Sequence, residues 1–286
     1  MDIEILKARA AIVGAIRRFF DDRGFVEVET AVRIPAPAPE EHIDCPVVSA
    51  ADGTTYLRAS PELQMKKLLA AGLERIYQIG PCFREGERGS RHNPEFTMLE
   101  WYRKGATYLD IKEDMERLTA VLGLVEGSAT VLSVRDAYAA HAGWDPWTAW
   151  DRDRFDIDMA TKVEPALKEM GGGVFLMDYP PQVASLAKIS ANADSWAHAE
   201  RWEFYFDGIE LANCFTELCD KDEQMRRFKN AKEVRKVLKE ADYPIDYEFI
   251  ECLPKIRQAA GVALGIDRLV MALTKSKEIS AVRAYL

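Results

Sequence analysis

The stretch HNPEFTMLEWYR, residues 92–103, alternates like a β-strand but carries a carboxylate in the middle of its apolar residues. Because strand side chains point to opposite faces in turn, Phe96, Met98, Glu100 and Tyr102 share one face. A buried carboxylate is costly unless it is paired or hydrogen-bonded. Two interpretations are therefore open: either this face is solvated, or it lines a pocket that receives a cation.

The surrounding sequence predicts that this stretch is the second strand of a hairpin. IYQIGPCFR (76–84) is strand-like, and GERGS (86–90) forms a polar turn before residues 92–103. Residues 201–218 contain two more strand-like runs joined at Asp207-Gly208, a dipeptide typical of tight hairpin turns. A glycine-rich strand followed by a helix occupies residues 260–274.

Helical patterns separate the predicted strands. Residues 60–72 begin with Ser60 as an expected cap and Pro61 at the expected first helical position. Further helices are predicted over residues 5–23, 107–122 and 221–240. The simplest architecture is one α+β domain over residues 1–286, with a large antiparallel sheet flanked by helices.

Composition narrows the class of protein. The chain has 286 residues, 48% of them hydrophobic and 30% charged, and its net charge is −9. An acidic chain is poorly suited to gripping nucleic acid as its main task. No apolar run approaches the roughly 20 residues of a membrane helix, and the N-terminus lacks the apolar core of a signal peptide. We therefore expect a cytoplasmic protein without a membrane partner. The five cysteines form no CxxC pair that would indicate a zinc site.

Three separated segments carry residue types suited to nucleotide chemistry. The hairpin around residues 83–96 is rich in arginine, whose planar fork of donors matches phosphate oxygens. Carboxylates recur over residues 203–217, and carboxylates beside phosphates indicate Mg²⁺. Glycines near residue 265 let a strand lie flat against a ligand. The sequence has no P-loop and no GxGxxG, so nucleotide binding of another kind is expected.

These segments resemble the motifs of class II aminoacyl-tRNA synthetases. FREGERGSRHNPEF (83–96) is similar to motif 2, GVALGIDR (261–268) to motif 3, and FFDDRGFVEVET (19–30) to motif 1. SPELQMK, HNPEFTMLEWY and ELANCFTEL narrow the resemblance to the lysyl subgroup. It covers residues 5–285 and implies the class II catalytic-domain fold. Motif 1 helps to build the dimer interface in that family, so a homodimer is implied, although Ala31 stands here where the family has proline.

The resemblance assigns roles to residues at matching positions. Glu100, Tyr102 and Glu217 would meet the side-chain ammonium of a lysine-like substrate, and Glu62 would take its other amino group. The whole substrate-binding set is Ser60, Glu62, Glu100, Tyr102, Asn213, Glu217 and Ala263. The ATP-binding set is Arg84, Glu85, Glu87, His92, Asn93, Phe96, Glu210, Leu211, Gly265 and Arg268. Arg84 and Arg268 are the catalytic pair, and Glu203 and Glu210 would hold Mg²⁺.

Two details of these assignments need structural resolution. Motif 2 usually reads Arg-x-Glu, whereas Arg84 is followed by Glu85, Gly86 and Glu87; the adenine-reading glutamate is one of the two, and we favour Glu87. Strict strand alternation places Asn213 and Glu217 on one face and Glu210 on the other. If all of them serve one reaction, the strand must bulge or twist near residues 211–212.

Within the lysyl subgroup, the chain resembles the elongation factor P–(R)-β-lysine ligases. Its first helix is expected at about residue 5, so no anticodon-binding barrel and no tRNA partner are expected. Those ligases adenylate (R)-β-lysine with ATP and pass it to a lysine ε-amine of elongation factor P. Ala263 stands where lysyl-tRNA synthetases resemble G-x-G, and the added methyl should disfavour α-lysine by about 1–3 kcal/mol. The alternatives are a lysine-adenylating ligase acting on another carrier, a non-catalytic paralogue and a free-standing tRNA synthetase.

Overall fold

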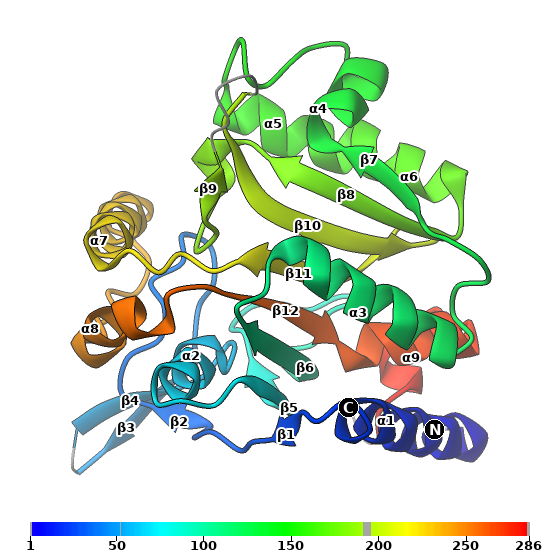
Figure 1. Cartoon of the computed structure of the whole chain (residues 1–286), viewed down its shortest axis with the longest axis horizontal. Coiled ribbons are helices and arrows are strands. Elements are labelled where there is room, and N and C mark those ends of the chain that lie inside the picture. The colour runs from blue at the N-terminus through cyan, green and yellow to red at the C-terminus, as the bar shows by residue number, and fades with distance from the viewer. Residues whose placement is uncertain (1, 52, 191–195, 285–286) are drawn as a thin grey trace. The chain divides into compact units, whose positions relative to one another are not determined.

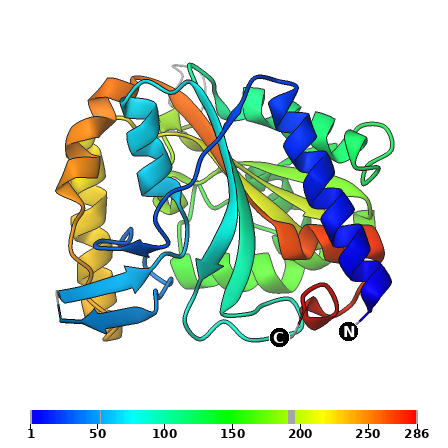
Figure 2. The same cartoon turned by 90° about the horizontal axis from the view of Figure 1, so that it is seen from below.

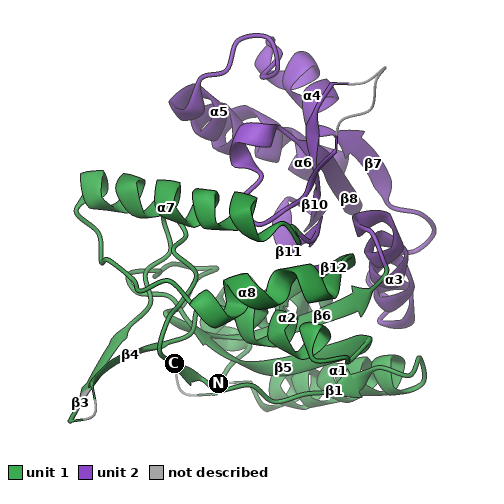
Figure 3. Cartoon of the chain, turned by 60° about the vertical axis from the view of Figure 1, so that its left-hand side comes forward, with its two compact units in different colours: residues 1–105, 218–259, 263–286 green, residues 106–217, 260–262 purple. Residues whose placement is uncertain are grey.

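A computed structural model describes residues 2–51, 53–190 and 196–284, and Figure 1 shows their helices and strands in chain order. The chain divides into two compact units, coloured separately in Figure 3. The first unit comprises residues 1–105, 218–259 and 263–286, and the second comprises residues 106–217 and 260–262. The expectation of one domain over residues 1–286 is not tested by this division and stays a prediction.

Over its described residues, the first unit combines five α-helices with two groups of strands. Its helices are α1 (Ile3–Asp21), α2 (Glu62–Ala70), α7 (Lys221–Leu238), α8 (Tyr247–Ile256) and α9 (Ile266–Thr274), with a 3₁₀ turn η4 (Ile279–Ala281). Its larger strand group runs in the order β1 (Val26–Glu27), β5 (Arg75–Phe83), β6 (Glu95–Lys104) and β12 (Ala259–Gly265). The smaller sheet has the order β2 (Arg33–Ile34), β4 (Gly53–Leu57) and β3 (Val47–Ala50).

The hairpin of β5 and β6 is the centre of the first unit. It pairs antiparallel from Arg75↔Arg103 to Phe83↔Glu95 without a register shift. On the odd-numbered face of β6, Leu99 and Trp101 are completely buried. The ring centroid of Trp101 lies 5.2 Å from that of Phe20 on α1. Figure 2 shows α1, in blue, alongside α9, in red, and the two helices are in contact.

The second unit is built on four neighbouring strands. Their order is β11 (Ile209–Thr216), β10 (His198–Phe206), β8 (Gly173–Tyr179) and β7 (Thr130–Ser133), with β9 (Ile189–Ser190) paired to β10. Its helices are α3 (Tyr108–Val121), α4 (Val134–Ala137), α5 (Arg152–Asp158) and α6 (Glu164–Met170). Two π-helical turns, η1 (Tyr138–Ala142) and η2 (Met159–Val163), and a 3₁₀ turn, η3 (Pro181–Val183), complete it. Residues 260–262, in the middle of β12, belong to this unit, whereas the rest of β12 belongs to the first.

The turn at Asp207-Gly208 joins β10 and β11 as predicted. Both residues have positive φ, 48° and 73°, which a two-residue type I′ hairpin turn requires. A side chain at position 208 would also place its Cβ 2.4 Å from Cβ of Lys168. Glycine is therefore needed there both for conformation and for space.

The α+β prediction is confirmed, and the details differ in physically informative ways. The sheet is mixed and not wholly antiparallel as predicted, because β1 pairs parallel to β5 and β7 pairs parallel to β8. Helix α2 begins at Glu62, one residue later than expected, so Pro61 is its N-cap residue and Ser60 precedes the cap. Its hydroxyl nevertheless accepts from the Glu62 amide at 3.0 Å. Helix α8, which contains Pro254, was not among the helices predicted from the sequence.

Among the described residues, no helix combines the length with the apolar character that crossing a bilayer requires.

Candidate active site

The first unit holds Glu100 of β6 as a fully buried carboxylate, with none of its surface exposed. One oxygen accepts from the Ser60 hydroxyl at 2.6 Å, and the other accepts from the Tyr102 hydroxyl at 2.8 Å. Both donors were predicted members of the substrate-binding set. Of the two interpretations of this face, the solvated one is wrong.

Burial, and after it the nearby Glu62 carboxylate, raise the pKa of Glu100 to about 7 against the hydrogen bonds from Ser60 and Tyr102 and the charge of Arg58, which lower it. A carboxyl group in this range changes charge near neutral pH when a cation approaches. The position therefore favours a positively charged ligand over a neutral one.

Glu62 lies in the first turn of α2 and is largely buried. It forms an ion pair with Lys66 one turn later, and the Lys66 side chain is almost completely buried. Opposite charges four residues apart on a helix face each other. Glu62 therefore adds a second carboxylate beside Glu100, partly neutralised by its own lysine.

Arg84 follows β5 and is held from two sides. Its guanidinium lies 5.2 Å from the centroid of the Phe96 ring and 3.6 Å from the Glu87 carboxylate. Its Nε is buried and has no hydrogen-bond partner among the residues that the structure describes. Glu85 is exposed, and its amide donates to the Asp44 carbonyl oxygen at 2.7 Å. Of the two motif 2 glutamates, Glu87 is thus the one in contact with Arg84.

Arg268 on α9 reaches the tip of the hairpin. Its Nη2 donates to Nε2 of His92 at 2.5 Å. Partial burial and the neighbouring Arg268 guanidinium lower the pKa of His92, which keeps its ring neutral and able to accept. Asn93 donates from Nδ2 to the Glu95 carbonyl at 2.6 Å. Gly265 and Ala263 are half-buried on β12, directly before α9.

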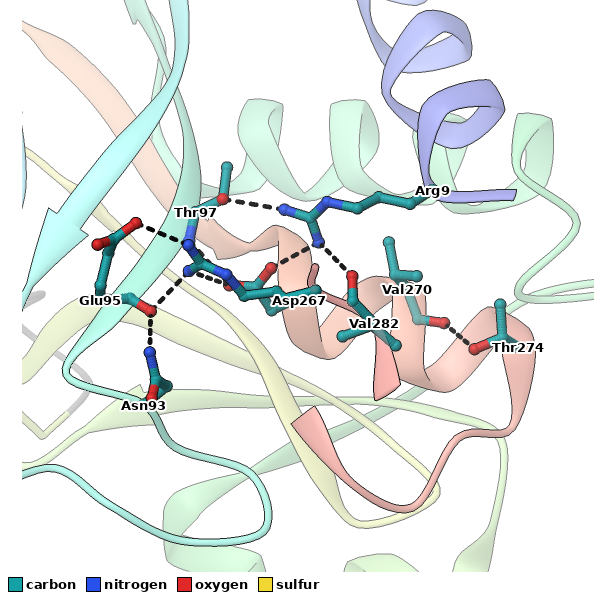
Figure 4. Close-up of polar contacts among 9 residues, drawn as sticks. Arg9, Asn93, Glu95, Thr97, Asp267, Val270, Thr274 and Val282 are labelled. Carbon is teal, nitrogen blue, oxygen red and sulfur yellow. Dashed lines mark hydrogen bonds and ion pairs between the residues drawn. The ribbon is translucent and has the colours of Figure 1, made fainter. Parts of the chain in front are cut away.

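Asp267, the neighbour of Arg268, is the centre of a buried ionic cluster (Figure 4). Its Oδ1 accepts from Nη1 of Arg9 at 2.6 Å, and its Oδ2 accepts from the Thr97 amide at 2.8 Å. Nη2 of Arg9 also donates to the Thr97 hydroxyl at 2.9 Å. Arg283 lies 3.6 Å from Asp267 and donates to Oε1 of Glu95 at 2.8 Å. The cluster ties α1 and the C-terminal segment to the start of β6 and to α9.

The second unit holds Glu203 on β10 as its central carboxylate. Oε2 accepts from the hydroxyls of Tyr179 at 2.6 Å and Tyr205 at 2.7 Å, and Oε1 accepts from Nη2 of Arg201 at 2.5 Å. Nε of Arg201 donates to the Asn213 side-chain oxygen at 3.1 Å. Burial and the Glu203 carboxylate raise the pKa values of both tyrosines well above normal, so both hydroxyls remain donors.

A bulge in β11 brings Glu210 to the face of Asn213. Glu203 pairs with Asn213 and Phe204 with Ala212, but Tyr205 pairs with Glu210, so Leu211 is the extra residue. Directly paired residues share a face, and Glu203 and Tyr205 alternate onto one face of β10. The predicted irregularity near residues 211–212 is confirmed. Leu211 itself is buried, which places its side chain away from solvent.

Glu217 follows β11 and is also buried. It forms an isolated bridge with Ala187, and it raises the pKa of the Cys214 thiol after burial, which is the larger cause. The predicted residues thus fall into two local sets. The first unit contains those at positions 60–102 and 263–268, and the second contains Glu203, Glu210, Leu211, Asn213 and Glu217.

Sequence reasoning missed several residues that contact the predicted ones. Arg201 was detectable, because it alternates with Glu203 on the same strand face. Tyr179 and Lys66 are brought to their carboxylates by folding, and Arg9, Asp267 and Arg283 meet from distant parts of the chain. Over residues 2–51, 53–190 and 196–284, no group of three or more acidic, histidine or cysteine side chains is arranged to hold a metal ion.

Comparison with known proteins places this geometry in a family. Residues 3–286 match the family model described as tRNA synthetases class II (D, K and N). A protein of Yersinia enterocolitica named elongation factor P–(R)-β-lysine ligase is 39% identical over 98% of this chain and 94% of its own. Proteins with the same name from Sodalis glossinidius and Yersinia pestis are 38% and 39% identical, with the same coverage.

Asp267→Ala should lower the free energy of unfolding by about 3–5 kcal/mol, because it leaves Arg9 largely buried without its carboxylate. Denaturant unfolding measures the difference. Glu113→Ala is the matched control, because it removes an exposed carboxylate paired with Arg117 and should cost less than about 1 kcal/mol. Equal effects of the two substitutions would contradict a buried ionic centre at Asp267.

Glu100 should make stability depend on pH in a defined direction. The pKa of Glu100 is raised in the folded protein, so between pH 4.5 and about 7 the folded state keeps a proton that the unfolded chain loses. The stability that this proton contributes is complete below the ordinary pKa of 4.5. It is lost as the pH rises through about 7. Between pH 5 and 8, the wild type should lose about 3 kcal/mol relative to Glu100→Gln. Denaturant unfolding at several pH values tests this, with Glu113→Gln as an exposed control that should track the wild type. A constant difference between wild type and Glu100→Gln would contradict the shift.

Proposed function

Because the chain belongs to the class II tRNA synthetases of the D, K and N group and, within them, to the elongation factor P–(R)-β-lysine ligases, we propose that it shares their activity. It adenylates (R)-β-lysine with ATP. It then passes the aminoacyl group to the ε-amine of a lysine on elongation factor P. The identities of the acceptor protein, of the amino acid substrate and of ATP as the co-substrate are parts of this proposal.

The buried Glu100 is the observation that carries the proposal. A carboxylate without exposed surface, which accepts hydrogen bonds from two uncharged hydroxyls and has a raised pKa, is stabilised by an arriving ammonium group. Glu62 supplies a second carboxylate for the other amino group of a diamine, and Glu217 is proposed to assist at the side-chain ammonium. Ser60 and Tyr102 orient Glu100, which fixes where the cation is bound.

The nucleotide is proposed to bind around Arg84, Phe96 and Arg268. The Nε of Arg84 is buried without a partner among the described residues, and such a donor is suited to a phosphate or carboxylate oxygen. The half-buried Phe96 ring offers a stacking surface for adenine, while Glu87 and the backbone near Glu85 would read its edge. His92, Asn93, Gly265 and Leu211 complete the proposed ATP set, and Arg268 is assigned to the γ-phosphate.

Glu203 and Glu210 fit a magnesium ion that is held mainly by phosphate oxygens. Glu203 already accepts three hydrogen bonds, which leaves about one of its four lone-pair sites. Mg²⁺ usually takes one or two protein carboxylates, with water and substrate phosphates as its other ligands. When bound, the ion would neutralise charge on the phosphates.

The chemistry needs no protein nucleophile. The substrate carboxylate attacks the α-phosphorus, pyrophosphate leaves, and an aminoacyl adenylate forms. Arg84 and Arg268 neutralise the phosphate oxygens during this step, and Asn213 orients the substrate. The ε-amine of the acceptor lysine then loses a proton, attacks the acyl carbon and displaces AMP. The homodimer, the cytoplasmic location and the absence of a tRNA partner stay predictions.

ATP–pyrophosphate exchange with the purified protein tests the adenylation step. We expect exchange with (R)-β-lysine above that with α-lysine, and at least a 100-fold loss of kcat/KM in Arg84→Ala and Arg268→Ala, or about 3 kcal/mol. Arg117→Ala, at an exposed arginine, is the control and should behave as the wild type. Lack of exchange with either amino acid would favour the non-catalytic alternative. A transfer assay with elongation factor P and with other carrier proteins separates the acceptors.

Ala263→Gly tests the basis of amino-acid preference. Removing the methyl should raise the kcat/KM ratio of α-lysine to (R)-β-lysine about tenfold, since methyl-sized discrimination is worth about 1–3 kcal/mol. The KM for ATP should stay unchanged. An unchanged ratio would remove Ala263 from the specificity determinants while leaving the ligase activity in place.

A further inference from the structure

The end of strand β8 breaks the alternation of a regular strand. Leu176 pairs with Glu203, so these two side chains share a face. Continued alternation would place Asp178 on that face and Tyr179 on the opposite one. Instead, the Tyr179 hydroxyl donates to Glu203 at 2.6 Å, and Tyr179 lies on the Glu203 face.

The backbone of Asp178 produces this exchange of faces. Its φ is 62°, in the left-handed region that residues other than glycine enter at a cost, with Asp and Asn the best tolerated. The pairing with β10 shifts at the same point, from Trp202↔Met177 to Ala199↔Tyr179. Left-handed residues at such irregularities commonly redirect a side chain.

The Asp178 side chain is anchored on the opposite face. Its Oδ1 accepts from the Tyr108 hydroxyl at 2.8 Å and lies 3.7 Å from Nε2 of His198. Both partners belong to the same unit, at the start of α3 and of β10. A residue held in a strained conformation persists when its surroundings fix it, and these two contacts supply that restraint.

We propose that Asp178 is a positioning residue for Glu203, acting through Tyr179. Its left-handed backbone turns Tyr179 to the Glu203 face, and the anchors at Tyr108 and His198 keep it there. Tyr179 in turn donates to one lone pair of Glu203. The Arg201 guanidinium carbon lies over the Tyr179 ring, 4.4 Å from the ring centroid. These contacts hold the Glu203 carboxylate in one orientation, which fixes the direction of its remaining lone pair. This inference rests on the proposed role of Glu203.

A substitution series at position 178 separates backbone conformation from anchoring. Asp178→Asn keeps the left-handed tolerance and an acceptor for Tyr108, so it should resemble the wild type. Asp178→Gly adopts positive φ freely but loses both anchors, and Asp178→Ala loses both anchors and the tolerance. Tyr108→Phe removes one anchor without touching the backbone and serves if Asp178→Ala does not fold. Lys239→Ala, at another left-handed residue with φ 62° in the first unit, is the matched control.

Crystal structures and magnesium titrations of these variants are the test. We expect Tyr179 to leave Glu203 in Asp178→Ala, and the Mg²⁺ concentration for half-maximal exchange to rise at least tenfold. Asp178→Gly should lie between Asp178→Ala and Asp178→Asn, and Lys239→Ala should match the wild type. Asp178→Ala combined with Tyr179→Phe should be no worse than Tyr179→Phe alone, because both act through one contact.

Two outcomes overturn the inference. One is a Tyr179–Glu203 contact that persists in Asp178→Ala, and the other is an additive effect of the two substitutions. Failure of the proposed function looks different, because the wild type would then show no exchange. In that case, the crystal structures still decide whether Asp178 positions Tyr179.

Discussion

A carboxylate that leaves water must be met by donors, and both units are organised around carboxylates that satisfy this constraint. Glu100 is met by two hydroxyls, Asp267 by a guanidinium and a backbone amide, and Glu203 by two phenols and a guanidinium. An unmet buried carboxylate would cost several kcal/mol or take up a proton. The three differ in the charge of their donors. Asp267 and Glu203 have arginine partners at hydrogen-bond distance, whereas the hydroxyl donors of Glu100 carry no charge. Burial is the main cause that raises the pKa of Glu100 to about 7.

This difference separates structural from ligand-binding roles. Asp267 is neutralised by a guanidinium within the fold, and its contacts reach α1, β6 and the C-terminal segment, so it serves architecture. Among the described residues, Glu100 accepts hydrogen bonds only from uncharged hydroxyls, and the Arg58 guanidinium lowers its pKa less than burial raises it. The position therefore suits the ammonium group of the proposed substrate. Glu203 is intermediate, because hydrogen bonds from Arg201 and two tyrosines leave it about one free lone pair. One lone pair suits a metal ion that takes most of its ligands from phosphates and water better than a metal enclosed by protein ligands.

Strand geometry is interrupted where functional groups must be gathered. The extra residue Leu211 moves Glu210 to the face of Asn213, and the left-handed Asp178 moves Tyr179 to the face of Glu203. Each interruption shifts the register locally and changes the face to which the following side chains point. The β5–β6 hairpin has no interruption of its register, and its site residues Phe96, Glu100 and Tyr102 follow plain alternation.

Sequence alone determined the features that depend on local rules. Period-two alternation predicted the faces of β6, and Asp207-Gly208 predicted a hairpin turn. The opposite faces of Asn213 and Glu210 predicted a bulge or twist near residues 211–212 if both serve one reaction, and the bulge lies at Leu211. The three motifs identified the family. Only the tertiary structure decided that Glu100 is buried, that Lys66 pairs with Glu62, and that Arg9 and Arg283 meet at Asp267. Burial depends on what packs over a residue, and ion pairs between distant segments depend on the path of the chain; neither quantity is encoded in the local pattern. Tyr179 is the clearest case, because a single left-handed residue reverses the face that its sequence position predicts.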